Sequence, residues 1–153
     1  MRVLALVSAR DYLPPMEILR QMERDDAYPR VTLFEDELGC DVADEAFVAR
    51  APRTRRLFYR ALPMFVAQVI ETWMVRRRYD VVITWGERLT LLYALLQLLT
   101  LDRTPHVAMM YWISPPKKAR VLRLTQSRIT RILMWSQAQR DFAVRQLRIS
   151  AAK

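Results

Sequence analysis

The chain has 153 residues, 52% of them hydrophobic, which is enough for one domain with a hydrophobic core. Its net charge of +9 is concentrated in two blocks: residues 50–78 hold 8 basic side chains against 1 acidic, and residues 115–153 hold 10 against 1. A single cysteine, Cys40, excludes an internal disulfide and favours a reducing compartment, and one cysteine with one histidine excludes a metal site of the usual kind. The basic blocks indicate an anionic partner, either nucleic acid, a phospholipid surface or a phosphorylated substrate, unless they are only solvated faces.

The first third of the chain predicts a βαβ unit. Residues 2–7 form a short apolar run typical of a strand, and because this strand begins at once, no signal peptide is expected. Pro14 or Pro15 suits the first turn of a following helix, and residues 31–35 predict a second strand. The acidic segment 35–45 is expected to be a surface loop without a regular element.

Residues 53–78 are basic and amphipathic. Apolar side chains from Phe58 to Trp73 recur at spacings of three and four, opposite a charged face that includes Glu71, and Pro63 either kinks this helix or starts its main part. The helix packs on the sheet with its arginines in water, or it also touches an anionic membrane. The candidates for phospholipid contact are Arg53, Arg55, Arg56, Arg76, Arg77 and Arg78.

The segment 79–101 predicts a buried strand, a tight turn at Gly86 and a helix. Residues 81–83 are a continuous β-branched run, as expected for a strand buried on both faces. Residues 89–101 contain no charge, but thirteen helical residues span roughly 20 Å, less than the ~30 Å hydrocarbon core. This helix is therefore not a membrane span, and it needs cover on both sides.

The last third predicts two more strand and helix pairs. Residues 106–112 and 129–135 are expected strands, and a helix covers 119–128. His106 opens its strand, away from the carboxyl end, so a catalytic role is disfavoured. Ser136 and Gln139 have capping-box spacing at the start of a final helix that runs through Leu147.

Strands that alternate with helices predict an α/β fold: a Rossmann-like, doubly wound, mostly parallel sheet with helices on both faces, in one domain over residues 1–153. Ligands bind at the carboxyl ends of such strands, where polar side chains gather in this chain. The GxGxxG and Walker A patterns are absent. We expect these residues to line a cleft: Asp11, Tyr12, Trp85, Gly86, Glu87, Arg88, Ser114 and Ser136.

Three stretches of the chain resemble a known family: "YDVVITWGERLTLLYALL", "PHVAMMYWISPPKKAR" and "ITRILMWSQAQRDFAVRQL". They are similar to the amino-terminal, Rossmann-like domain of family 4 glycosyltransferases, which have the two-domain GT-B fold. The resemblance covers most of the chain and is strongest from Tyr79 to Leu147. The family's glycine-rich loop after the first strand is replaced here by residues 8–15, and its histidine after a later strand by residues 111–114.

This resemblance implies the acceptor-binding half of a hexosyltransferase. A nucleotide-sugar donor would bind in a second domain that is absent from this chain or is encoded as a separate subunit, so the half would be inactive alone. The whole enzyme would transfer a sugar to a glycan or lipid-linked acceptor in polysaccharide biosynthesis, with no metal or other cofactor, in the cytoplasm or as a peripheral protein at the inner membrane. No catalytic residue is assigned. The alternative is a non-enzymatic basic module for nucleic acid or anionic membrane, and nucleic acid is less favoured because no known binding motif is present.

Overall fold

The structure is a computed structural model that describes residues 1–7, 16–27, 32 and 36–153. Its centre is a sheet of five parallel strands in the order β2-β1-β3-β4-β5. The predicted α/β class and parallel sheet are therefore confirmed. The strands are β1 (Val3–Leu6), β2 (Asp41–Ala43), β3 (Val81–Trp85), β4 (His106–Met110) and β5 (Arg131–Met134).

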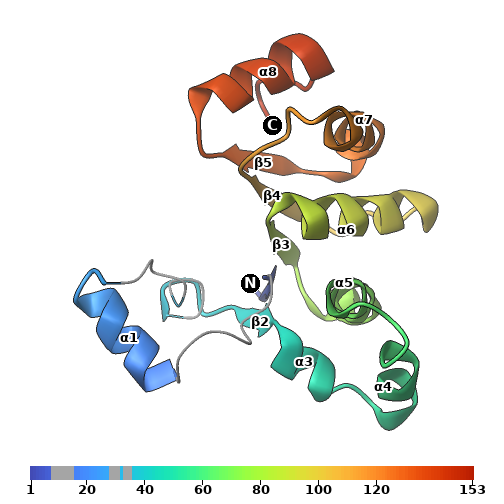
Figure 1. Cartoon of the computed structure of the whole chain (residues 1–153). Helices are drawn as coiled ribbons and strands as arrows, with labels where there is room; N and C mark the ends of the chain where they lie inside the picture. Colours follow the sequence, from blue (N-terminus) through green and yellow to red (C-terminus); the bar gives the residue numbers. More distant parts are fainter. Residues whose placement is uncertain (8–15, 28–31, 33–35) are drawn as a thin grey trace.

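Helices flank this sheet, as a Rossmann-like doubly wound fold requires. In Figure 1, α5, α6 and α7 follow one another along one side of the strands, and α1 lies on the other side. The helices are α1 (Met16–Arg24), α3 (Glu45–Ala49), α4 (Arg53–Tyr59), α5 (Met64–Val75), α6 (Glu87–Leu99), α7 (Pro116–Thr125) and α8 (Gln137–Leu147), with short 3-10 turns η1 (Arg76–Arg78) and η2 (Gln126–Arg128).

One core cluster lies between the sheet and α5 and α6. Val82 of β3 is fully buried there, together with Val69 of α5 and Tyr93 of α6. On the other face of β3, Val81 and Ile83 are only partly buried. The β-branched run therefore forms the predicted strand, but it is completely covered on one face only.

The second strand differs from the prediction. It is Asp41–Ala43, within the segment expected to be an acidic loop, and it pairs in parallel with β1. Most of the predicted strand 31–35 lies outside the described residues, and Thr32 is in a turn. Three residues among acidic neighbours give too short an apolar pattern to be recognised as a strand. Edge strands of natural sheets are often this short.

The basic helix also differs in detail. Of the two roles expected for Pro63, the second is confirmed: Pro63 is the N-cap of a separate helix, α5, and α4 ends before it at Tyr59. Phe58 is 58% exposed rather than part of a buried stripe. Glu71 is buried rather than on the wet face, because its carboxylate accepts a hydrogen bond from the Tyr59 hydroxyl at 2.7 Å and pairs with Arg55 at 3.2 Å.

The strand order places one topological feature at the centre of the sheet. The chain runs from β1 to β2 on one side and then returns to β3 on the other side of β1. The connections that leave the carboxyl ends of β1 and β3 therefore diverge. In open parallel sheets, a crevice forms at this switch point and holds the ligand.

Candidate functional site

A pocket of about 480 Å³ opens where β3 ends. Four residues predicted to line the cleft contribute to it in sequence, since Trp85 closes β3, Gly86 makes the turn, and Glu87 and Arg88 begin α6. The other lining residues are Met64, Phe65, Gln68, Leu89 and Tyr111. Asp11 and Tyr12, which follow β1, lie outside the described residues.

Gly86 makes the turn into the pocket possible. Its φ of +96° and ψ of 148° belong to a backbone region that side-chain-bearing residues rarely adopt. Its N–H donates to the carbonyl of Met109 on β4 at 2.9 Å, and its carbonyl accepts from the N–H of Thr90 in α6 at 3.0 Å. The glycine therefore joins the strand, the neighbouring strand and the helix at one point.

The Glu87 carboxylate holds the loop that follows β4. Its Oε1 accepts the backbone N–H groups of Tyr111 at 2.7 Å and Trp112 at 2.5 Å, and its Oε2 lies 3.4 Å from the Lys118 ammonium. Burial of the carboxyl group opposes its ionisation, but the N–H groups of Trp112 and Tyr111 and the Lys118 charge outweigh it and lower the pKa of Glu87. Glu87 is therefore an ionised structural anchor that fixes one wall of the pocket.

The two serines predicted to line the cleft lie at the same edge of the sheet but not in this pocket. Ser114 follows β4 and Ser136 follows β5, and Gln139 of α8 links them. The Gln139 amide oxygen accepts the Ile113 N–H at 2.8 Å, its amide nitrogen donates to Ser114 Oγ at 3.0 Å, and its backbone N–H donates to Ser136 Oγ at 3.3 Å. Ser136 caps α8 as predicted, but the expected return of the Gln139 side chain to Ser136 is wrong because that side chain bridges to the β4 loop.

Aromatic side chains extend the rim from β3 to β5. The Tyr111 and Trp135 rings stack at 5.2 Å with an interplanar angle of 12°, and Trp85 and Trp135 lie 6.5 Å apart. Tyr111 is 40% exposed and Trp135 is 60% exposed. Trp85 was among the residues predicted to line the cleft, but Tyr111 and Trp135 were missed, although both lie within or at the end of predicted strands.

Phe65 and Gln68 were also missed as pocket residues. They belong to α5, whose amino-terminal half passes beside the end of β3. The Arg88 guanidinium lies over the Phe65 ring at 5.1 Å, so the two lining side chains are in contact. The Gln68 amide nitrogen donates to the Val7 carbonyl at 3.2 Å and so ties α5 to the end of β1.

The arginines predicted to contact phospholipid have different environments. Arg53, Arg56, Arg77 and Arg78 are exposed, and Arg55 is half-buried beside Glu71. Arg76 is buried, and its Nε lies 2.8 Å from the Asp102 carboxylate while its guanidinium covers the Trp73 ring at 4.0 Å. The prediction for Arg76 is therefore wrong, because an internal ion pair holds its charge.

His106 opens β4, as predicted, and it is fully buried there. Its Nε2 and the Thr84 hydroxyl are 2.8 Å apart, the Thr84 and Thr90 hydroxyls are 2.7 Å apart, and the Tyr93 ring meets the imidazole edge to face at 5.0 Å. Burial lowers the pKa of His106 to about 3, so the imidazole is neutral at ordinary pH. Thr84 therefore belongs to the core and not to the rim, and Cys40 is likewise a buried thiol.

Residues 1–7, 16–27, 32 and 36–153 contain no group of three or more His, Cys, Asp or Glu side chains that could hold a metal ion. Among the same residues, no helix combines the length and the hydrophobicity needed to cross a membrane. Comparison with protein-family models, with curated proteins and with solved structures gave no match.

Proposed function

We propose that this chain is the acceptor-binding half of a glycosyltransferase that transfers a sugar from a nucleotide-sugar to a glycan or lipid-linked acceptor. The observation that carries the proposal is the pocket at the switch point, which the aromatic residues Tyr111 and Trp85 line together with Glu87 and Arg88 of α6. Sugar rings bind to such surfaces through their C–H faces, which pack on aromatic rings, and through their hydroxyls, which need hydrogen-bonding partners. The sequence resemblance described above supports the same function.

The roles of the residues follow from their positions. Tyr111 and Trp85 would hold a sugar ring, and Arg88, which also lines the pocket, would donate hydrogen bonds to hydroxyl or phosphate oxygens. Glu87 would act indirectly by holding the Tyr111 backbone in place. The donor and the groups that act on it would be supplied by a second domain or subunit, so the described residues bind and orient the acceptor.

The test is ligand-observed saturation-transfer NMR with methyl glycosides of glucose, galactose, mannose and N-acetylglucosamine, and with UDP-glucose as a donor probe. We expect at least one glycoside to receive saturation on its ring protons, and UDP-glucose to receive much less. Tyr111→Ala should abolish the signal. Trp112→Ala is the matched control because Trp112 is an exposed neighbouring aromatic that does not line the pocket.

Three results would contradict the proposal. The first is a signal for none of the glycosides, and the second is equal saturation of UDP-glucose and the glycosides. The third is an equal loss in the Tyr111 and Trp112 variants, because the signal would then not come from the pocket.

A further inference from the structure

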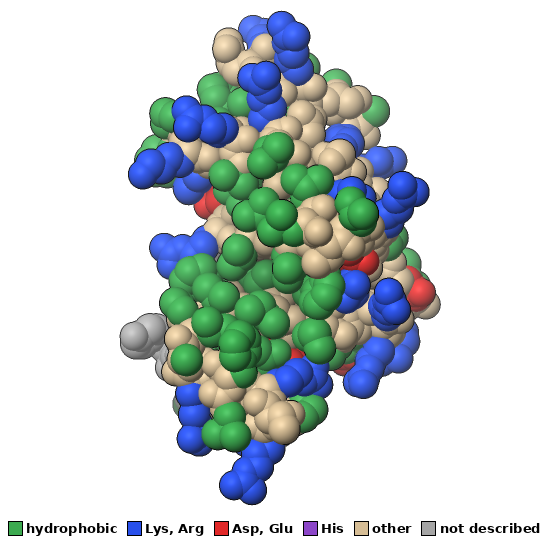
Figure 2. Space-filling view, turned by 90° about the vertical axis from the view of Figure 1, so that its right-hand side faces the viewer, with side chains coloured by type: hydrophobic (Ala, Val, Ile, Leu, Met, Phe, Trp, Pro, Cys, Tyr) green, Lys and Arg blue, Asp and Glu red, His purple; other side chains and the backbone are tan. Residues whose placement is uncertain are grey.

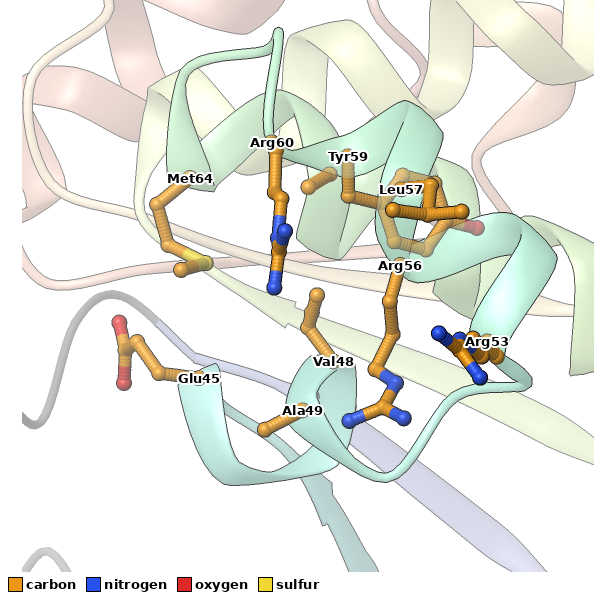
Figure 3. Close-up of a pocket in the computed structure, with 10 residues that line it drawn as sticks. Glu45, Val48, Ala49, Arg53, Arg56, Leu57, Tyr59, Arg60 and Met64 are labelled. Atoms are coloured by element: carbon orange, nitrogen blue, oxygen red, sulfur yellow. The ribbon is translucent and has the colours of Figure 1, made fainter.

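A second pocket, of about 340 Å³, lies between α3, α4 and the start of α5. Its basic residues are Arg53, Arg56 and Arg60, which follow one another on α4 and its C-cap at spacings of three and four. At these spacings the side chains leave the same face of a helix. Figure 3 shows the Arg56 and Arg60 side chains extending together toward α3, with Arg53 beside Arg56.

These three guanidinium groups carry uncompensated charge. None of them forms an ion pair with a residue that the structure describes, whereas their neighbour Arg55 pairs with Glu71 at 3.2 Å. Among the described residues of the pocket wall, the acidic one is Glu45, which lies toward the other end of the pocket from Arg53 in Figure 3, and its Oε1 is 3.4 Å from the Gln68 amide nitrogen. The pocket therefore presents an excess of positive charge that fits a phosphate group of charge −1 or −2.

The rest of the wall is apolar. Val48, Ala49 and Ala67 line the pocket between the helices. Two larger side chains that also line it are open to solvent, since Leu57 is 56% exposed and Met64 is 45% exposed. A free phosphate would leave these side chains uncovered, but a phosphate that carries hydrocarbon would cover them.

The surface around the pocket also suits an amphiphilic ligand. Figure 2 shows the side of the molecule that carries the helices on the right of Figure 1, where hydrophobic side chains gather in a broad patch with Lys and Arg side chains around it. Exposed side chains of α4, α5 and the end of α6 include Phe58, Met74 and Leu99. Apolar side chains flanked by arginines are the composition that binds the headgroup region of an anionic bilayer.

We propose that this pocket binds the phosphate group of an anionic lipid, with Arg53, Arg56 and Arg60 around the phosphate and Leu57 and Met64 against the hydrocarbon. The lipid is presented by a bilayer surface, and the chain docks on that surface through α4 and α5. The proposal does not depend on sugar binding, which uses the aromatic residues of the other pocket. Met64 lines both pockets, so an amphiphile in this one would lie next to the acceptor pocket.

The test compares binding of the whole chain to several probes at low and physiological salt. The probes are vesicles of phosphatidylcholine with and without 30% phosphatidic acid, soluble dihexanoyl phosphatidic acid, inorganic phosphate, inorganic diphosphate and duplex DNA. Vesicle and DNA binding are measured by co-sedimentation, and binding of the small probes by calorimetry. We expect binding to both phosphatidic acid probes, and at least tenfold weaker binding to phosphatidylcholine alone, to the inorganic anions and to DNA.

Two triple variants separate the pocket from general charge. Replacing Arg53, Arg56 and Arg60 with glutamine should weaken vesicle binding by roughly 100-fold, since each basic residue at an anionic surface contributes roughly fivefold. Replacing Arg140, Arg145 and Arg148 with glutamine removes the same charge from α8 and its C-cap, and should change binding less than twofold. Leu57→Ser removes only an exposed apolar side chain, so it should fold normally and still weaken phosphatidic acid binding.

Several outcomes would overturn the proposal. An equal loss in the two triple variants would mean that net charge alone drives binding. Equal affinity for inorganic phosphate or diphosphate would assign the pocket to a free phosphate compound, and equal affinity for DNA would assign the arginines to nucleic acid. Absence of binding to every probe would leave the arginines as a solvated face. If the α4 triple variant unfolds, an unchanged affinity in Leu57→Ser would itself refute the lipid assignment.

Discussion

The buried imidazole of His106 makes the stability of this chain depend on pH. The folded protein keeps the imidazole neutral because its pKa is lowered to about 3 by burial, whereas the ordinary value is 6.5. As pH falls below 6.5, the unfolded chain takes up a proton that the folded chain does not. Since the unfolded state then binds more protons, the free energy of unfolding falls with falling pH between about 6.5 and about 3.

The size of this effect follows from the two pKa values. Between pH 7.5 and pH 5.0, the preference of the unfolded state for the proton lowers the free energy of unfolding by about 2 kcal/mol. Asp102 and Glu87 add little over this interval, because their pKa values are lowered in the fold and their stabilisation is lost only at about pH 4 and below. The His106 contribution therefore dominates in this window.

Urea unfolding, followed by circular dichroism at pH 7.5, 6.5 and 5.0, tests this prediction on the natural chain and on His106→Gln. The glutamine amide can replace the Nε2 contact with the Thr84 hydroxyl, which is 2.8 Å long, but it does not titrate. The natural chain should lose about 2 kcal/mol more than the variant between pH 7.5 and 5.0. Parallel losses in the two proteins would refute the reasoning, whatever the stability of the variant at pH 7.5.

Three further substitutions test the contacts around the candidate site. Glu87→Gln should lower the free energy of unfolding by about 1–2 kcal/mol and change the near-UV circular dichroism of Trp112. The reason is that an amide oxygen accepts the loop N–H groups less strongly than a carboxylate. An unchanged spectrum would show that the charge does not hold the loop. Gly86→Ala should lower the free energy of unfolding, measured with urea, by about 1–3 kcal/mol. The whole effect should come from the φ of +96°, since nothing lies within 4 Å of an added Cβ. An unchanged stability would contradict this backbone conformation. Arg76→Ala should lower the free energy of unfolding by about 3 kcal/mol, because it leaves the Asp102 carboxylate without its ion-pair partner. Arg77 is exposed, so Arg77→Ala should change the free energy of unfolding by less than about 0.5 kcal/mol. Similar effects of the two substitutions would contradict the ion pair.

The parts of the fold that could be predicted depend on local pattern. The strand at Val81–Trp85, the turn at Gly86 and the helix after it are contiguous, so their hydrophobic pattern and the glycine were sufficient. The presence of a pocket at the carboxyl end of β3 followed from the parallel topology. The short strand Asp41–Ala43 could not be predicted because it is held by its pairing with β1, about 37 residues away in the sequence, and not by its own composition.

The parts of the site that could not be predicted depend on contacts between distant segments. Residues 76, 77 and 78 are all arginine, and only the fold distinguishes the first, by placing Asp102 and the Trp73 ring against its guanidinium. Glu87 was placed correctly at the rim, but its bonds to the backbone of Tyr111 depend on the register that sets Trp85 beside Met109. Sequence spacing gives no measure of such contacts.

The wall of the candidate acceptor pocket is organised before any ligand arrives. Glu87 fixes the start of the loop after β4 by accepting two of its backbone N–H groups, and Gln139 fixes the next part by accepting the N–H of Ile113. The loop is therefore attached to α6 and to α8, and the Tyr111 ring that it carries is stacked on Trp135. A binding surface that is already ordered loses little conformational entropy when it binds, so a weakly interacting ligand such as a sugar ring gains most from it. In the described part of the chain, no such network holds Arg53, Arg56 and Arg60 of the proposed lipid pocket. The affinity of that pocket should come instead from charge and hydrocarbon contact with a surface that presents many copies of the ligand.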